Sequence, residues 1–322
     1  DGYKVTVFEK QPIPGGMLTL GIPAFRLEKQ VVEAEIEVLR QMGVEFRCGV
    51  DVGKDVTIPQ LREQGFTGFY LAIGAQAGRK LNIPGEDAGN VAAGVDFLRR
   101  INLGERPAMQ GSVVIFTATN VAIDVARSAV RTGGTVQMFC LESRAEMPAL
   151  EEEIQEALDE DIQIQNGWGP REILTENGRI TGVVFQRCTR VFDENHRFAP
   201  VFDEADTITV PADHVLLSVG QSIQWGGLLD GTKVRLNPNG TAIADGFTYQ
   251  TDEPDIFVGG DAFTGPKFAI DAIAAGKQAA ISLHRFVQPG QSLTYGRDRR
   301  EYHSLDKDNL VVEGFDTTPR QR

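Results

Sequence analysis

Short apolar runs recur along the chain and end on glycine or on an acidic residue, with amphipathic stretches between them. Alternation of apolar and polar residues predicts strands, and apolar residues at helical spacing predict helices. In the first part of the chain this pattern predicts strands at residues 3–9, 44–52 and 68–74 and helices at residues 28–42 and 58–64. Strands that alternate with helices are typical of an α/β fold with a parallel sheet.

A second strand–helix–strand unit begins further along the chain. Its predicted elements are a strand at 112–116, a helix at 121–132 and a strand at 135–140. An acidic helix is predicted next, at residues 149–159, and alternating strands near 180–190 and 207–210 follow it. Turn sequences at residues 176–178 and 193–195 bound these last strands, which predicts hairpins.

Two apolar strands close on glycine in the same way, one at Gly74 and one at Gly220. Each follows one of the two predicted nucleotide-type units, so the architecture repeats within the chain. Residues 268–286 form a predicted Ala-rich helix near the end, and residues 291–322 are charged and weakly periodic. We expect this last segment to be an extended surface arm.

The stretch from Asp255 to Asp261 gives the clearest indication of a ligand, because a short apolar strand ends there in two glycines and an acid before the long helix. Glycines let backbone approach a bulky group, a carboxylate accepts from sugar-like hydroxyls, and a helix start offers free N–H groups. A flavin dinucleotide uses all three: Asp261 for the ribitol, Gly260 beside the pyrophosphate, and backbone N–H groups of Ala269 and Ile270 for the pyrimidine edge. The alternative is the strand, turn and helix of an ordinary α/β core.

The first predicted strand ends on Glu9, and in a dinucleotide-binding unit the second strand ends in this way, with its carboxylate on the adenosine ribose. The sequence lacks the glycine-rich turn that precedes such a strand by about twenty residues. We therefore expect the native first strand, phosphate loop and helix to lie upstream; the alternative is that Glu9 is a solvated strand end. Residues 12–23 are too rich in Gly and Pro for a helix or central strand, which predicts an ordered loop around a ligand.

Composition argues against several classes of function. The net charge of −13 repels nucleic-acid phosphates and anionic lipid, and no apolar run approaches the length of a membrane span, so we expect neither nucleic acid nor a membrane as partner. The three cysteines and four histidines lie far apart without ligand spacing, so we expect no metal site in this chain. Unpaired thiols are most simply those of a reducing cytosol, which predicts a cytoplasmic protein.

Several motifs in a fixed order are more specific than any one of them. They are PGGMLTLGIPAFRL, FYLAIGA, NVAIDVARSA, EMPA, LLSVGQ and DIFVGGDAFTGP followed by AIAAGKQAA. In this order, over residues 1–286, the chain resembles the small, flavoprotein subunit of NADPH-dependent glutamate synthase and its relatives. The resemblance implies a two-dinucleotide-binding flavoprotein with two Rossmann-like domains, in which an NAD(P)-type domain is inserted into a split FAD domain.

The resemblance also implies boundaries and site residues. The FAD domain would comprise residues 1–108, without its first strand and glycine loop, and residues 222–290; the NAD(P)-type insert would comprise residues 109–221, and the arm residues 291–322. The residues expected at FAD are Glu9, Lys10, Gly16, Met17, Val52, Gly74, Gly260, Asp261, Ala269 and Ile270. The residues expected at a nicotinamide dinucleotide are Thr117, Thr119, Asn120, Val121, Glu142 and Gly220.

The match is weakest at the nicotinamide site. Relatives carry three glycines before Asn120, where this chain has Thr117-Ala118-Thr119. They also carry a tyrosine and two arginines where this chain has residues 140–142, which end on Glu142. Threonines tolerate a positive φ poorly, and an acid opposes a 2′-phosphate but accepts from a ribose diol, so NADH is favoured over NADPH if either binds.

Three functions remain open from the sequence. The first is an FAD-dependent pyridine-nucleotide oxidoreductase that passes hydride from NADH or NADPH to FAD and electrons onward to an iron–sulfur protein or domain, with the upstream part of the same polypeptide as one candidate. The second is an FAD electron-transfer subunit with a degenerate nicotinamide site, and the third is a non-redox scaffold. Hydride transfer needs no protein nucleophile, so no catalytic residue is assigned.

Overall fold

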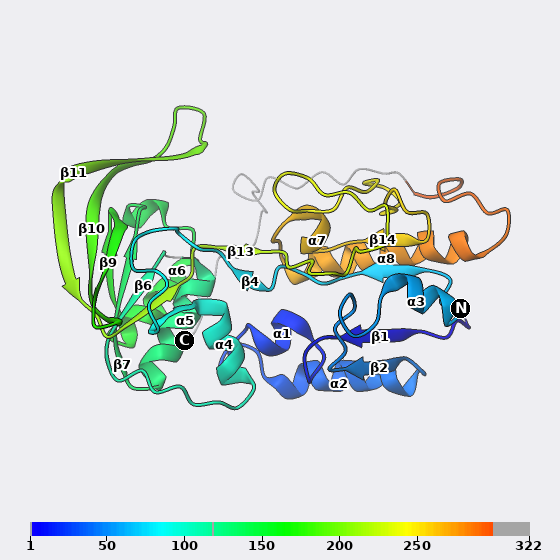
Figure 1. Cartoon of the computed structure of the whole chain (residues 1–322), viewed down its shortest axis with the longest axis horizontal. Helices are drawn as coiled ribbons and strands as arrows, with labels where there is room; N and C mark the ends of the chain where they lie inside the picture. The colour runs from blue at the N-terminus through cyan, green and yellow to red at the C-terminus, as the bar shows by residue number, and fades with distance from the viewer. Residues whose placement is uncertain (1, 118, 299–322) are drawn as a thin grey trace, which may run out of the picture.

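A computed structural model describes residues 2–117 and 119–298, and Figure 1 shows that these residues form two α/β lobes side by side. The lobe at the left of the view holds β5 to β12 with α4, α5 and α6. The lobe at the right holds both ends of the described chain, with β1, β2, β3 and β14. The predicted two-domain α/β class is therefore confirmed.

A five-stranded parallel sheet forms the centre of the left lobe, in the order β5-β12-β6-β7-β8. Three helices cover one face, and an antiparallel sheet in the order β11-β10-β9 packs on the other. The parallel strands are β5 (Val91–Ala93), β6 (Gly111–Phe116), β7 (Gly134–Cys140), β8 (Gln163–Asn166) and β12 (His214–Leu217). The helices are α4 (Gly94–Asn102), α5 (Asn120–Arg131) and α6 (Glu151–Asp159), with a short 3-10 turn η1 (Arg144–Glu146), and the antiparallel strands are β9 (Trp168–Glu176), β10 (Arg179–Phe192) and β11 (Phe198–Pro211).

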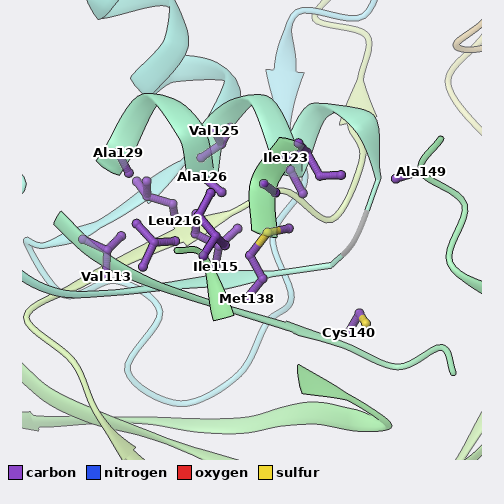
Figure 2. Close-up of a cluster of buried hydrophobic side chains, with 14 of the residues drawn as sticks. Val113, Ile115, Ile123, Val125, Ala126, Ala129, Met138, Cys140, Ala149 and Leu216 are labelled. Atoms are coloured by element: carbon purple, nitrogen blue, oxygen red, sulfur yellow. The ribbon is translucent and has the colours of Figure 1, made fainter. Parts of the chain in front are cut away.

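Alternation along β6 divides the core of this lobe into two layers. Val113 and Ile115 point to the helices and pack with residues of α5 such as Ile123 (Figure 2). Val114 and Phe116 point to the antiparallel sheet instead. All four side chains are almost completely buried, as expected for a central parallel strand with both faces covered.

Two separate pairs of parallel strands organise the right lobe. β1 (Thr6–Glu9) pairs with β2 (Glu45–Cys48), and β3 (Phe69–Leu71) pairs with β14 (Ile256–Val258). Within the described ranges, β1 has no strand partner but β2, and β3 none but β14. The helices of this lobe are α1 (Gly16–Leu20), α2 (Lys29–Gln41), α3 (Ile58–Glu63), α7 (Asp261–Thr264) and α8 (Ala269–Val287).

Two short strands connect the lobes. β4 (Ala77–Gly78) leads into the left lobe, β13 (Gln221–Ser222) leads out of it, and they pair antiparallel. β5 and α4 lie beyond β4 and belong to the left lobe, because β5 hydrogen-bonds to β12 and α4 packs on α5. We therefore propose that the inserted domain begins between β4 and β5, rather than at the predicted residue 109.

Most predicted elements occur within a few residues of their predicted positions, but residues 12–23 are not all loop. Gly15 takes φ 113° and starts the short helix α1, and the fully buried Leu20 fixes that helix to the core. The prediction of a loop without helix was wrong because burial of an apolar residue outweighed the low helix propensity of glycine. The predicted arm lies outside the described residues from residue 299 onward.

Candidate functional site

The predicted flavin residues Gly260 and Asp261 lie at the carboxyl end of β14, beside the end of β3. Gly259 N donates to Leu71 O at 3.2 Å, so the two strand ends stay paired. Gly260 takes φ 63° and ψ −152°, a backbone region that only glycine enters without strain. A Cβ on Gly259 would lie 2.1 Å from the hydroxyl of Tyr70, so neither glycine accepts a side chain without local rearrangement.

Asp261 begins α7, and its Oδ1 accepts a hydrogen bond from Lys267 N at 3.1 Å. This contact folds the residues after α7 back toward the start of α8, where the chain reaches Ala269 and Ile270. In the described structure no acceptor is assigned to the backbone N–H groups of Ala269 and Ile270, the usual condition of a first helical turn. The side chains of Phe268 and Ile270 are 78% and 67% exposed. Carboxylate, free N–H donors and uncovered apolar surface therefore lie together at this edge.

The side chain of Gln76 lies near two glycines, one after β1 and one after β3. Gln76 Nε2 lies 3.3 Å from the position of a Cβ on Gly74 and 3.7 Å from one on Gly16. Both glycines have positive φ, and Met17 follows Gly16 in α1. The structure thus brings the predicted residues Gly16 and Gly74 together. Sequence reasoning missed Gln76, although its place two residues after the strand-ending glycine is a usable signal.

Glu9, Lys10 and Val52 lie at the carboxyl end of β1 and β2. Glu9 Oε1 accepts from Gln11 N at 2.8 Å, and burial of the carboxyl raises its pKa. Lys10 points to solvent and pairs with Asp51 at 3.0 Å. Val52, in the segment after β2, packs on the cluster that contains residues of β3 and β14.

The turn between β6 and α5 holds the predicted nicotinamide residues. Thr117 takes φ 85°, which is an outlier for a β-branched residue, and its N–H donates to Phe139 O at 2.7 Å. Thr119 caps α5, with Oγ1 accepting from Ala122 N at 3.3 Å. Ala118 lies outside the described residues. The turn therefore keeps a glycine-like backbone at Thr117, at a cost of about 1–3 kcal/mol.

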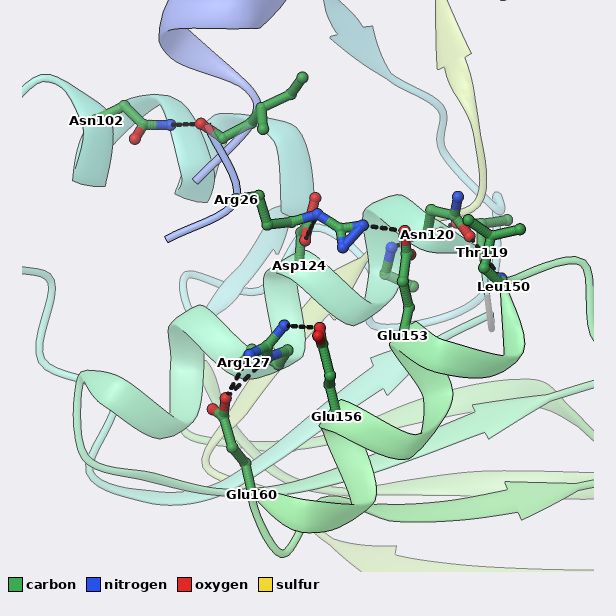
Figure 3. Close-up of polar contacts among 12 residues, drawn as sticks. Arg26, Asn102, Thr119, Asn120, Asp124, Arg127, Leu150, Glu153, Glu156 and Glu160 are labelled. Atoms are coloured by element: carbon green, nitrogen blue, oxygen red, sulfur yellow. Dashed lines mark hydrogen bonds and ion pairs between the residues drawn. The ribbon is translucent and has the colours of Figure 1, made fainter. Parts of the chain in front are cut away.

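The side chain of Asn120 is engaged within the lobe. Its Oδ1 accepts from Leu150 N at 3.1 Å, which ties the start of α5 to the segment before α6 (Figure 3). Val121 is partly buried against the α5 core. Glu142 follows β7 and uses its carbonyl to accept from Gly167 N and Asn166 Nδ2, at 3.3 and 3.0 Å. The segment after β7, where a ribose is expected, is thus fixed by β8.

Gly220 follows β12, whose last residue Leu217 pairs with Phe116 directly before the Thr117 turn, and it begins the connection between the lobes. It takes φ 100°, and its carbonyl accepts from Arg79 N at 3.1 Å, next to the pairing of β4 with β13. Its positive φ serves the connecting ribbon, and its nicotinamide role stays a prediction.

A cavity of about 500 Å³ opens where β7 and β8 end, under the long β10–β11 hairpin. Sequence reasoning predicted the hairpin but not that it covers this edge. Side chains of the hairpin and of the segment after β7 line the cavity, among them Leu141, Arg144, Asn166, Cys188, Arg190 and His196. The adenosine end of a dinucleotide occupies the corresponding edge of a Rossmann fold.

The two candidate cofactor sites differ in fit. The flavin edge offers glycines that leave space for a ligand, a carboxylate and unpaired N–H groups, so the residues present fit FAD. The second site has a helix start and a cavity, but Thr117 places a branched side chain where a pyrophosphate needs close backbone. No cluster of metal-ligating side chains occurs in the described part of the chain. No helix in that part combines the length and apolarity that crossing a membrane requires.

Comparisons with curated proteins agree with this geometry. The chain is 35% identical over 297 residues to the NADP(+)-dependent formate dehydrogenase subunit beta of Moorella thermoacetica, covering 90% of this chain and 41% of that protein. It is 31% identical over 310 residues to the glutamate synthase [NADPH] small chain of Escherichia coli, covering 89% and 64%. The chain thus spans about two fifths to two thirds of the length of the curated relatives it matches.

Solved structures show the same fold at low identity. Mycobacterium tuberculosis FprA in complex with NADPH superposes with a TM-score of 0.72 at 18% identity, covering 88% of this chain and 77% of that chain. Thioredoxin reductase of T. acidophilum superposes with a TM-score of 0.65 at 18% identity, covering 88% and 90%. The family model described as pyridine nucleotide-disulphide oxidoreductase matches residues 1–276. The two-dinucleotide-binding architecture is confirmed, and the chain belongs to the pyridine nucleotide-disulphide oxidoreductase family.

Proposed function

We propose that this chain is the flavin-dependent part of a pyridine-nucleotide oxidoreductase of the glutamate synthase small-subunit type. The observation that carries the proposal is the flavin edge, where Gly260, Asp261 and the unpaired N–H groups at the start of α8 follow β14, and Gly74 follows the neighbouring strand β3. Family membership and the likeness to relatives whose names include NADPH or NAD support it. The residues expected at FAD are those assigned from the sequence, with Gln76 added.

When bound, FAD accepts a hydride and passes its electrons on singly or in pairs. The role of this chain is to hold and orient that group. Asp261 would accept from the ribitol, Glu9 from the adenosine ribose, and the N–H groups at the start of α8 would stabilise negative charge on the pyrimidine edge. Exposed apolar surface at Phe268 and Ile270 would cover a face or edge of the ring.

The proposed onward acceptor is an iron–sulfur protein or domain, in the same polypeptide or in a partner. Its support is the relatives, whose named assemblies include a formate dehydrogenase, a dihydropyrimidine dehydrogenase and a glutamate synthase. Free thiols at Cys140 and Cys188 support a reducing, cytoplasmic location.

A second function is favoured by one observation, the positive φ of Thr117 in the dinucleotide turn. If that turn no longer accepts a pyrophosphate, the protein is an FAD electron-transfer subunit and the left lobe serves as a docking surface.

Anaerobic titration tests the two functions. A visible flavin spectrum is expected in the purified protein, and bleaching of that spectrum by NADH supports the oxidoreductase. A flavin that neither NADH nor NADPH bleaches, but that a chemical reductant does, supports the electron-transfer subunit. A colourless protein that takes up no added FAD contradicts both.

A further inference from the structure

A short segment of the flavin lobe contacts the second lobe. Phe25 and Arg26 lie in the turn between α1 and α2, where Arg26 N donates to Pro23 O at 3.0 Å. Arg26 Nε lies 3.1 Å from Asp124 Oδ1 on α5, and the same guanidinium pairs with Glu153 on α6. Figure 3 shows the Arg26 side chain between Asp124 of α5 and Glu153 of α6.

The charges in this contact are largely withdrawn from water. The side chains of Arg26, Asp124 and Glu153 are 21%, 11% and 9% exposed. Exposed ion pairs contribute little, but a buried carboxylate that loses its cation is strongly destabilised. Without Arg26, Asp124 and Glu153 would be left close together with like charges, so this contact resists separation of the lobes.

Phe25 adds a second contact to the same helix. Its ring centroid lies 4.6 Å from Arg127 Cζ and 3.9 Å from Arg131 Cζ. Both guanidinium groups also pair with Glu160, which directly follows α6, and Arg127 pairs with Glu156 on α6. Phe25 and Arg26 therefore engage successive turns of α5, along one polar face of that helix.

Both halves of the proposed reaction depend on where α5 lies. α5 begins at the dinucleotide turn. The segment with Phe25 and Arg26 follows α1, which carries Gly16 and Met17 of the flavin edge. The connecting ribbon of β4 and β13 is short, and another contact between the lobes is from Asn102 Nδ2 to Leu20 O and Ile22 O, at 2.9 and 3.2 Å. Hydride transfer requires reacting atoms about 3–3.5 Å apart, so two ligands held on different lobes need a fixed lobe orientation.

We propose that Phe25 and Arg26 form an interlobe latch and that Arg26 is a positioning residue, which holds α5 and its dinucleotide turn at the orientation that hydride transfer to the flavin requires. The role in transfer rests on the proposed function, whereas the role in lobe orientation does not. Arg26 touches neither reacting group and acts through α5.

The first measurement determines the orientation of the two lobes, as a distance distribution between spin labels, in the protein without cofactor. Spin labels are placed on exposed positions of the two lobes, through Glu35→Cys on α2 and Glu176→Cys on β9, with Cys48→Ser removing a partly exposed thiol. Arg26→Gln is expected to broaden or shift the distance distribution between the labels. Arg26→Lys should retain most of the parent distribution, and Arg235→Gln, which breaks a surface pair with Asp252, should change nothing.

The second measurement determines the rate of hydride transfer from NADH to the flavin in the FAD-loaded protein. Arg26→Gln is expected to lower the limiting rate of flavin reduction by NADH about tenfold to a hundredfold, while the flavin midpoint potential stays at the parent value. An unchanged label distance in Arg26→Gln overturns the latch, even if the variant is less stable to heat. A shifted distance with an unchanged limiting rate overturns the positioning role. If neither nucleotide reduces the parent flavin, the proposed oxidoreductase fails, and the label distance alone decides the latch.

Discussion

Asp261 has an observed structural task and a proposed ligand-binding task. Its Oδ1 already accepts from Lys267 N, and that bond shapes the approach to α8. The remaining acceptor capacity of a carboxylate suits a hydroxyl of the proposed ribitol. A substitution that keeps the shape and removes the charge therefore separates the two tasks.

We expect Asp261→Asn to lower FAD affinity about tenfold or more, because a charge-assisted hydrogen bond is worth roughly 1.5–3 kcal/mol. The asparagine carbonyl can still accept from Lys267 N, so the fold near α7 should persist. Flavin fluorescence titration of the apoprotein measures the affinity, and Asp252→Asn, which alters a surface ion pair, is the control. Parent-like affinity in Asp261→Asn would remove Asp261 from the flavin site.

Thr117 is a β-branched residue in a backbone conformation that favours glycine. A φ of 85° is unfavourable for a branched side chain, by about 1–3 kcal/mol. Glycine relieves that strain but raises the entropy of the unfolded chain by roughly 0.5–1 kcal/mol. We expect Thr117→Gly to raise the free energy of unfolding by about 1 kcal/mol.

Thr119→Gly is the matched control, because Thr119 has an extended backbone and caps α5. It should lose a few tenths of a kcal/mol, since glycine is a weaker cap. Urea denaturation followed by near-ultraviolet circular dichroism measures both variants. A loss of stability in Thr117→Gly would show that the threonine makes a contact that outweighs its strain.

At the scale of elements, the local pattern of apolar and polar residues predicted helices and strands correctly where one or both faces of the element are buried. The helix predicted at 121–132 is α5 at Asn120–Arg131, and the strand at 135–140 is β7 at Gly134–Cys140. Local pattern failed at α1, where a buried leucine decides the conformation of a glycine-rich segment. The proposed assignment of residues 91–102 to the second lobe depends on pairing of β5 with a strand far along the chain, which local pattern does not show.

The same limit applies to the candidate site. The position of the glycines and the acid between a strand and a helix could be predicted from sequence, because strand, turn and helix are contiguous there. The contact of Arg26 with Asp124 could not, since these residues belong to different elements and different lobes. The covering of the β7 edge by the β10–β11 hairpin depends likewise on tertiary packing.

The polar face of α5 predicts a pH dependence of stability. Burial is the main cause that raises the pKa of Asp124 to about 7, with Glu153 and Glu156 also raising it and Arg26 and Arg127 opposing the shift. Lys29, which interacts with Asp124 electrostatically, is the remaining charged neighbour. Because the unfolded pKa is lower, the folded state binds more protons between the two values.

The free energy of unfolding should therefore fall as pH rises from about 4 to about 7, relative to Asp124→Asn, by at most about 1.4 kcal/mol per pH unit. Above pH 7 the difference between parent and variant should be constant. Arg26→Gln should extend the falling range to higher pH and leave its lower end unchanged, because Arg26 lowers the pKa of Asp124 in the folded state only. Urea midpoints at a series of pH values measure this, and a parent and Asp124→Asn that vary in parallel would contradict it.

At the scale of the whole molecule, the lobes differ in how completely their cofactor edges are built. The flavin lobe has its glycines, acid and helix start in place around β14. The second lobe has a complete parallel sheet and a covered edge, but its turn carries threonine in a glycine conformation. We therefore propose that the molecule keeps the scaffold for two dinucleotides and that threonine in the turn alters the contact to one of them.

This difference predicts how the molecule responds to nicotinamide nucleotides. Side chains in the turn should crowd a pyrophosphate, and Glu142 should oppose a 2′-phosphate, so NADPH should be the poorest reductant of the flavin and NADH at best a modest one. Substituting glycine at Thr117, Ala118 and Thr119 together should raise the rate with NADH about tenfold or more, since relief of one strained or crowded contact is worth roughly 1–3 kcal/mol. Anaerobic stopped-flow reduction measures both nucleotides in the parent and in the triple variant.

Glu142→Gln separates the two causes, because it removes the charge that opposes a 2′-phosphate and leaves the turn intact. It should improve NADPH relative to NADH, whereas the triple variant should improve both. The flavin spectrum should stay unchanged in all variants, because the flavin edge is built from the other lobe. Fast reduction of the parent by NADPH would contradict the predicted nucleotide preference and show that Thr117 accommodates a pyrophosphate. Reduction that appears only in the triple variant would favour the electron-transfer subunit, whose flavin receives its electrons by a route other than this turn.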